Sequence, residues 1–189
     1  MRPPWSRGRA SDPQYARKVP SVMAVMHHPI HPMVVVFPIA FLMAVPATDL
    51  AWLFTGDGFW ARLSLWLTGG GLVMGLLAAV FGIGDLLLLP EVRRKPAAWG
   101  HFIAAVMVLA LAGVGLWLRL PDPGAAVWPW GLAHGLVTAG VLAVAGWLGG
   151  TLSFHHGVGV YGHRPHGSDD AASPGGAEEN AGPSSIGRE

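Results

Sequence analysis

Four long apolar stretches, separated by short polar segments, dominate the middle of the chain. Each is close to the roughly 20 residues that an α-helix needs to cross a hydrocarbon core about 30 Å thick. In lipid such a segment must be helical, because its backbone amides find no water and need internal partners. The pattern therefore predicts an all-α integral membrane protein, a bundle of four transmembrane helices. The spans are expected at about Met33–Leu53, Leu63–Leu89, Phe102–Leu118 and Trp130–Phe154.

Polar segments flank the predicted bundle on both sides. Residues 1–26 form a polar leader with five Arg and Lys residues, to which we assign no ordered structure, and Met23 and Met26 are candidates for an alternative start. Residues 27–160 make up the four-helix domain. Residues 161–189 are rich in Gly, Ser, Pro, Asp and Glu, a composition typical of a disordered tail.

Composition supports a membrane protein and excludes several kinds of site. Charged residues make up 12% of the chain, about half the share of a typical soluble domain. There are no cysteines, which excludes disulfides, thiolate nucleophiles and iron–sulfur ligation. No basic run suggests nucleic-acid binding. The glycine pattern at 157–162 follows a membrane helix rather than a strand, so it does not predict nucleotide binding.

The distribution of Lys and Arg predicts the orientation of the bundle. Ten of the 12 lie on the side that holds the N-terminus, and only Arg62 and Arg119 lie on the other side. The positive-inside rule then places both termini in the cytoplasm, with the protein in the inner (plasma) membrane. Five tryptophans at the opposite side fit an interfacial aromatic belt, namely Trp52, Trp60, Trp117, Trp128 and Trp130.

Histidines and prolines crowd the start of the first span, in the segment HHPIHPMVVVFP at 27–38. Pro29 and Pro32 disfavour helical geometry at His28 and His31, the residues before them. We therefore expect an extended segment that presents both histidines on one face. Pro32 suits the first turn of the helix, where its missing N–H costs nothing.

Residues from the other three spans reach the same side of the membrane. Asp85 lies near the end of the second span, His101 at the start of the third, and His156 after the fourth. A carboxylate in a membrane helix is costly and usually faces the bundle interior; pairing with Arg93 or Arg94 as an interfacial anchor is the alternative. We expect the cofactor-binding residues to be His28, His31, His101 and His156, joined by Asp85 if the ligand is a metal ion. His134, on the opposite side, is interpreted as a helix-start residue.

The chain resembles the bacterial four-helix membrane family catalogued as domain of unknown function 2231. Four segments carry the resemblance: HPIHPMVVVFP, GIGD, AWGHF and GWLGGTLSFHHGVGV. The family has no established activity, and some relatives are joined to Rieske-type modules, which implies redox neighbours. The chain departs from the family pattern at Thr151, Phe154 and His155. The family's motif positions fall on His28, His31, Asp49, Asp85, His101, Gly149, Gly150 and His156.

Three functions stay open. The first is a transition-metal or haem b site at the cytoplasmic face in a redox-associated role, with a redox protein as partner; histidine suits both ligands. The second is a proton or small-solute pathway, disfavoured because the third and fourth spans carry few polar residues. The third is a non-catalytic subunit or assembly partner without a cofactor. No nucleophile–base pair favours an enzyme with its own substrate. Small-residue pairs, Gly71 with Gly75 and Gly146 with Gly150, leave a homodimer open.

Overall fold

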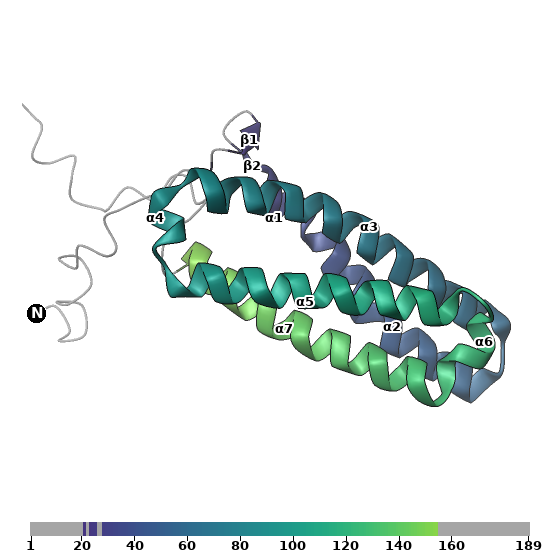
Figure 1. Ribbon diagram of the computed structural model, residues 1–189. Helices are drawn as coiled ribbons and strands as arrows, with labels where there is room; N and C mark the ends of the chain where they lie inside the picture. Colours follow the sequence, from purple (N-terminus) through teal and green to yellow (C-terminus); the bar gives the residue numbers. More distant parts are fainter. Residues whose placement is uncertain (1–20, 22, 26–27, 155–189) are drawn as a thin grey trace, which may run out of the picture. The chain divides into compact units, whose positions relative to one another are not determined.

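The computed structural model describes residues 21, 23–25 and 28–154 of the chain. The predicted tail lies outside these residues, as does nearly all of the predicted leader. Two short strands, β1 (Ala24–Val25) and β2 (His28–Pro29), pair antiparallel ahead of the first helix. The helices that follow are α1 (Ile30–Val34), α2 (Val36–Thr55), α3 (Gly58–Leu88), α4 (Pro90–Arg93), α5 (Pro96–Arg119), α6 (Pro123–Ala126), the π-helical turn η2 (Val127–Gly131) and α7 (Leu132–Phe154) (Figure 1).

Four helical segments are long and apolar enough to cross a membrane, which confirms the predicted architecture. They are Ile30–Thr55, Gly58–Leu88, Pro96–Arg119 and Pro123–Ser153. Large apolar side chains point outward along them; Trp66 and Trp147, for example, are 75% and 79% exposed. In water such a surface would be unfavourable, but in a bilayer it faces lipid chains.

Local caps mark two of the connections between spans. Gly56 closes α2 with a φ of 66°, a left-handed conformation that favours glycine. The Asp57 carboxylate then accepts a 2.8 Å hydrogen bond from the Phe59 N–H and caps α3. Asp122 caps α6 in the same way, and the peptide bond between Trp128 and Pro129 is cis.

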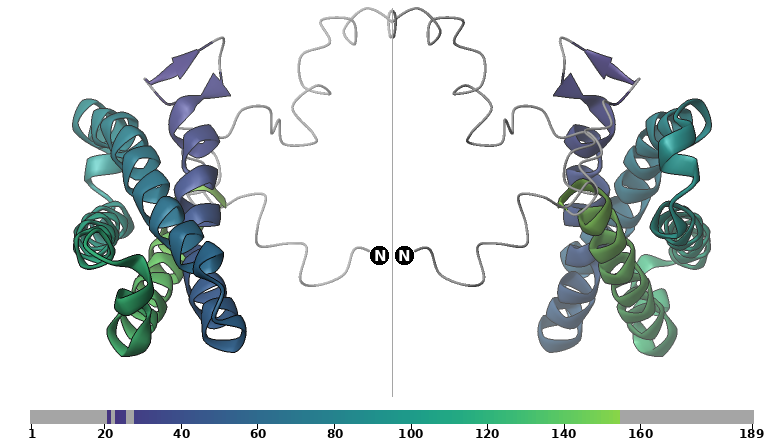
Figure 2. Two further views of the ribbon diagram at one scale, coloured as in Figure 1. Left: turned by 90° about the vertical axis from the view of Figure 1, so that its right-hand side faces the viewer. Right: turned by 90° about the vertical axis from the view of Figure 1, so that its left-hand side faces the viewer.

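The spans alternate in direction, so residues far apart in sequence meet at two ends of the bundle. His31, His101 and the end of α7 lie at one end, below called the histidine end. Thr55 and Arg119 lie at the other, below called the ion-pair end (Figure 1). Helix α2 packs on α3 and α5 packs on α7, and these two hairpins pack against each other (Figures 1 and 2).

The centre of the bundle is apolar and closely packed. Leu42, Val108, Ala112 and Leu142 form its buried core. A Cβ at Gly71 would lie 2.6 Å from the Leu42 side chain, and one at Gly75 would lie 2.7 Å from Leu109. These two glycines therefore serve packing within the bundle, whereas the neighbourhood of Gly146 is open. A homodimer stays a prediction.

The expected conformation at His31 is wrong, although the placement of Pro32 is confirmed. Helix α1 begins at Ile30, one residue after the extended Pro29, so His31 is helical and Pro32 lies in the first turn. The residue before a proline avoids helical geometry only as a preference. Here the tertiary hydrogen bond of the His31 ring, described next, favours the helix.

Candidate functional site

His31 is fixed by a hydrogen bond across the first hairpin. Its Nδ1 lies 2.8 Å from the backbone oxygen of Ala78 in α3. A carbonyl oxygen can only accept, so Nδ1 carries the hydrogen and donates, and the lone pair of the neutral ring is on Nε2. Gly82, one turn after Ala78, makes room for the ring: a Cβ there would lie 3.0 Å from both Cε1 and Nδ1 of His31.

His101 has the same arrangement in the second hairpin. Its Nδ1 donates to the backbone oxygen of Ala145 in α7, again at 2.8 Å. Gly149 follows Ala145 by one turn, and a Cβ there would lie 3.0 Å from Cε1 of the His101 ring. The two hairpins therefore hold one histidine each by the same device, a donated Nδ1 hydrogen and a glycine beside the ring.

The two rings meet between the hairpins at the histidine end. Their centres are 6.2 Å apart and their planes are inclined by 84°. Among the residues that the structure describes, the Nε2 atom of neither ring has a hydrogen-bond partner. Both rings are only half-buried. The expected convergence of helix ends thus brings together two histidines with their lone pairs uncommitted.

Asp85 does not form a group of three metal ligands with His31 and His101. Its Oδ2 accepts a 2.7 Å hydrogen bond from the Ser21 hydroxyl, and its Oδ1 accepts one of 3.1 Å from the Met23 N–H. Gly84 lies under the Met23 side chain, since a Cβ there would be 2.9 Å from Cγ of Met23. The carboxylate therefore ties the segment before β1 to the end of α3.

The other two histidines of the predicted site, His28 and His156, are not seen beside His31 and His101 in the described part of the chain. His28 lies in β2 with an exposed side chain, and His156 lies outside the described residues. Within the described part of the chain, no group of three or more His, Asp or Glu side chains is arranged to hold a metal ion. Of the five residues expected to form one cluster, the structure brings His31 and His101 together, and the binding role of all five stays a prediction.

A second polar cluster, at the ion-pair end, was missed in the sequence analysis. Arg119 Nη2 donates to Asp49 Oδ2 at 2.6 Å, and the two side chains are 1% and 0% exposed. Ser64 lies between them: its hydroxyl donates to Asp49 Oδ1 at 2.6 Å and accepts from Arg119 Nε at 3.0 Å. This triad joins α2, α3 and α5, and it neutralises two charges that would be costly alone in lipid.

Two backbone oxygens also accept hydrogen bonds from the guanidinium. Arg119 also donates to Gly131 O at 3.1 Å and to Gly115 O at 3.3 Å. Neither glycine position has room for a Cβ. A Cβ at Gly131 would overlap the Ala126 carbonyl oxygen, and a Cβ at Gly115 would lie 2.9 Å from the His134 ring. Arg119 is therefore an internal residue that links all four spans.

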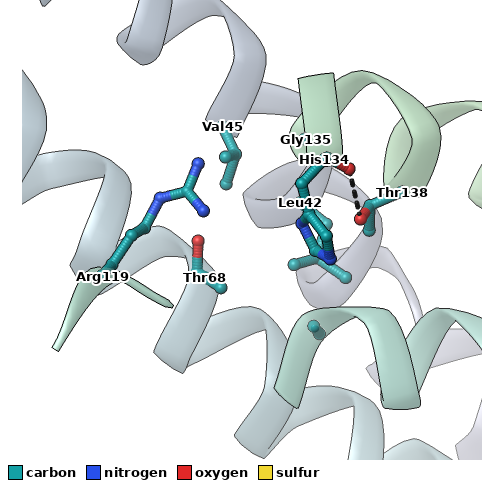
Figure 3. Close-up of a pocket in the computed structure, with 8 residues that line it drawn as sticks. Leu42, Val45, Thr68, Arg119, His134, Gly135 and Thr138 are labelled. Atoms are coloured by element: carbon teal, nitrogen blue, oxygen red, sulfur yellow. Dashed lines mark hydrogen bonds between the residues drawn. The ribbon is translucent and has the colours of Figure 1, made fainter. Parts of the chain in front are cut away.

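His134 stands beside this cluster, opposite the guanidinium of Arg119 (Figure 3). It lies in the first turn of α7, as expected of a helix-start residue. Its Nε2 is buried and has no hydrogen-bond partner within the described part of the chain. Thr68 and Thr138 also line the pocket that Figure 3 shows, and Thr138 lies on the other side of His134 from Arg119. The predicted role as a simple helix-start residue thus leaves out its place at a buried polar site.

One signal in the sequence indicates the missed pairing. Along the sequence, Asp49 follows His31 by the same number of residues as Arg119 follows His101. In two hairpins that run the same way, equal separations place the two charges at the same depth, just as they place the two histidines. Opposite charges at equal depth in facing helices favour an ion pair.

Comparison with known proteins supports this architecture. A family model described as "Predicted membrane protein (DUF2231)" matches residues 27–162, which include every described helix. No curated protein and no solved structure matches the chain. Since the match spans well over half of the sequence, the chain belongs to the DUF2231 family of predicted membrane proteins.

Proposed function

We propose that this membrane protein binds haem b, which His31 and His101 would hold, in a redox-associated role. The observation that carries the proposal is the paired geometry of these rings. Each donates its Nδ1 hydrogen to a backbone oxygen and keeps its Nε2 lone pair. Metal-bound histidines commonly have this arrangement, because the outer hydrogen bond fixes the tautomer and orients the ring.

The spacing of the rings suits two histidines that would hold one group between them. Their centres lie 6.2 Å apart, and an imidazole nitrogen binds a first-row metal at about 2.0–2.1 Å. The two rings are anchored in different hairpins, so a group held by both would join the hairpins at the histidine end.

The number of available ligands also favours haem over a bare ion. A zinc or other divalent ion usually takes three or four protein ligands, and the described residues contain no such group. A porphyrin supplies four nitrogens itself, so the two histidines would be enough to hold a haem. With no cysteine in the chain, the haem would be held without covalent attachment.

Each neighbouring residue has a defined part in this proposal. The carbonyls of Ala78 and Ala145 orient the rings, and Gly82 and Gly149 allow them to lie against the helices. The bound haem would supply one-electron redox chemistry. If the positive-inside prediction holds, the histidine end faces the cytoplasm, in the inner membrane, and a redox partner would approach there.

The competing proposal is a membrane subunit or assembly partner without a cofactor. The intramolecular bonds of Asp85 favour it, since they tie the chain together without a ligand. A proton pathway has less support, because the apolar core residues Leu42, Val108, Ala112 and Leu142 separate the two polar clusters.

Optical spectra of detergent-purified protein, before and after dithionite, test the proposal. We expect a low-spin haem b spectrum with a sharp reduced α band. His31→Ala and His101→Ala should each abolish it or convert it to a five-coordinate spectrum, which added imidazole restores. His134→Ala, which removes a histidine at the other end, is the matched control. Protein without haem after reconstitution, or spectra unchanged in both variants, would refute the ligand assignment.

A further inference from the structure

A small cavity lies inside the bundle at the ion-pair end, away from the proposed haem site (Figure 3). Its volume is about 10 Å³, which is close to the minimum for one water molecule. Both apolar and polar side chains line it, and α5 contributes one of each, Ala112 and Arg119. The lining residues used below are Leu42, Thr68, Arg119, His134, Gly135 and Thr138.

The polar groups around the cavity leave hydrogen-bonding capacity unused. His134 Nε2 is buried with no partner among the described residues, and a buried polar atom without a partner is costly. Arg119 has five N–H groups. It makes four hydrogen bonds, to Ser64, Asp49, Gly131 and Gly115, so one N–H on Nη1 remains.

The charges and hydroxyls around the cavity define what it can hold. Asp49 already neutralises Arg119, so the site does not call for an anion, and the guanidinium repels a cation. Thr68 donates its hydroxyl hydrogen to Ser64 O, and Thr138 donates its own to His134 O. Both threonines therefore present lone pairs, which suit a donor. The fitting ligand is neutral, water-sized, and able to donate and accept.

We propose that this cavity holds one internal water molecule, which accepts a hydrogen bond from Arg119 and bonds to His134 Nε2. A water can donate to a bare Nε2 or accept from a protonated one, so it satisfies either tautomer of His134. A threonine hydroxyl oxygen, of Thr68 or Thr138, accepts a remaining hydrogen. The water extends the Asp49–Ser64–Arg119 network to α7 through a side chain. The site does not depend on haem binding.

The first test fills the cavity without removing any polar group. A Cβ at Gly135 would make ordinary contacts, 3.4 Å from Val45 and 3.6 Å from Asp49 Oδ2, and would take up space beside the water. Gly135→Ala should therefore lower the melting temperature, because the displaced water leaves His134 unsatisfied. Gly140→Ala, in the same helix with nothing within 4 Å, measures the effect of alanine alone. If Gly135→Ala raises the melting temperature at least as much as Gly140→Ala, the cavity is dry and the proposal fails.

A second measurement uses the unaltered protein and so does not depend on folding of a variant. Brief radiolysis in H₂¹⁸O turns a bound water into a hydroxyl radical that oxidises its neighbours. Leu42 lines the cavity and is 2% exposed, whereas Leu86 is buried at 6% in the cluster near α4. We expect oxidation of Leu42 and His134, with slow uptake of the label, and little oxidation of Leu86. Equal protection of Leu42 and Leu86 would overturn the proposal.

Discussion

Arg119 and Asp49 form an ion pair at 2.6 Å in which both side chains are essentially inaccessible. Removing one partner leaves a buried charge without compensation, which typically costs about 3–5 kcal/mol. Asp49→Leu and Arg119→Met should each destabilise the protein by this order. The double variant should recover much of the loss, because replacing a whole buried pair by apolar groups is often nearly neutral.

Unfolding of the four proteins in detergent, analysed as a double-mutant cycle, measures this coupling. Arg62→Met is the matched control, since Arg62 is exposed at the same end of the bundle and should change stability by less than about 1 kcal/mol. Strictly additive losses in the double variant would contradict an internal ion pair.

Gly131 tests whether backbone packing holds the guanidinium in place. A Cβ at Gly131 would overlap the Ala126 carbonyl oxygen and lie 3.4 Å from Arg119 Nη2. Because a backbone atom cannot yield like a flexible side chain, Gly131→Ala should distort η2 and lower the melting temperature. Gly113→Ala, with nothing within 4 Å, should leave it unchanged or raise it. A similar melting temperature in both variants would contradict the tight packing.

The architecture could be predicted from the sequence, whereas the pairing of polar groups could not. Lipid permits only helices for long apolar spans, so the four spans followed from length alone. Nothing local in the sequence near Arg119 or Asp49 identifies a partner on another span. Their equal separation from His101 and His31 indicates that the two charges lie at the same depth, but it does not indicate that their side chains point toward each other.

At the histidine end, too, the sequence predicts which residues come together but not all of their hydrogen bonds. Alternating helix directions were enough to bring His31 and His101 to one side, and the structure places their rings 6.2 Å apart. Asp85 reached the same end, but its hydrogen bonds go to Ser21 and Met23, because the chain before α1 folds back there. Such a local turn has no periodic signal in the sequence.

Asp85 is expected to hold the segment before β1 against α3. Asp85→Asn keeps the size of the side chain but weakens the hydrogen bonds from the Ser21 hydroxyl and the Met23 N–H, since both go to a charged acceptor. Hydrogen exchange at the Met23 amide should therefore speed up severalfold, while the amides in the middle of α3 are unaffected. Ser21→Ala should give a smaller change in the same direction. Unaltered exchange at Met23 in Asp85→Asn would contradict this role.

The orientation of the bundle can be tested directly, because the chain contains no cysteine. Glu91 and Pro121 are exposed and lie at opposite ends, Glu91 in α4 and Pro121 between α5 and α6. If the histidine end is cytoplasmic, a membrane-impermeant maleimide should label Pro121→Cys in intact spheroplasts and Glu91→Cys only after lysis. The opposite pattern would reverse the predicted topology.

Gly82 and Gly149 offer the sharpest test of the paired histidines, because they change the rings' surroundings without touching a ligand. A Cβ at either position would lie 3.0 Å from Cε1 of its histidine, so the ring must shift by a few tenths of an ångström. Gly82→Ala and Gly149→Ala should each lower the haem content or change the reduced spectrum, and by similar amounts, since the two contacts are alike. Gly140→Ala controls for an added methyl group in a membrane helix. Full haem content with an unchanged spectrum in both variants would indicate that the haem, if bound, uses other ligands.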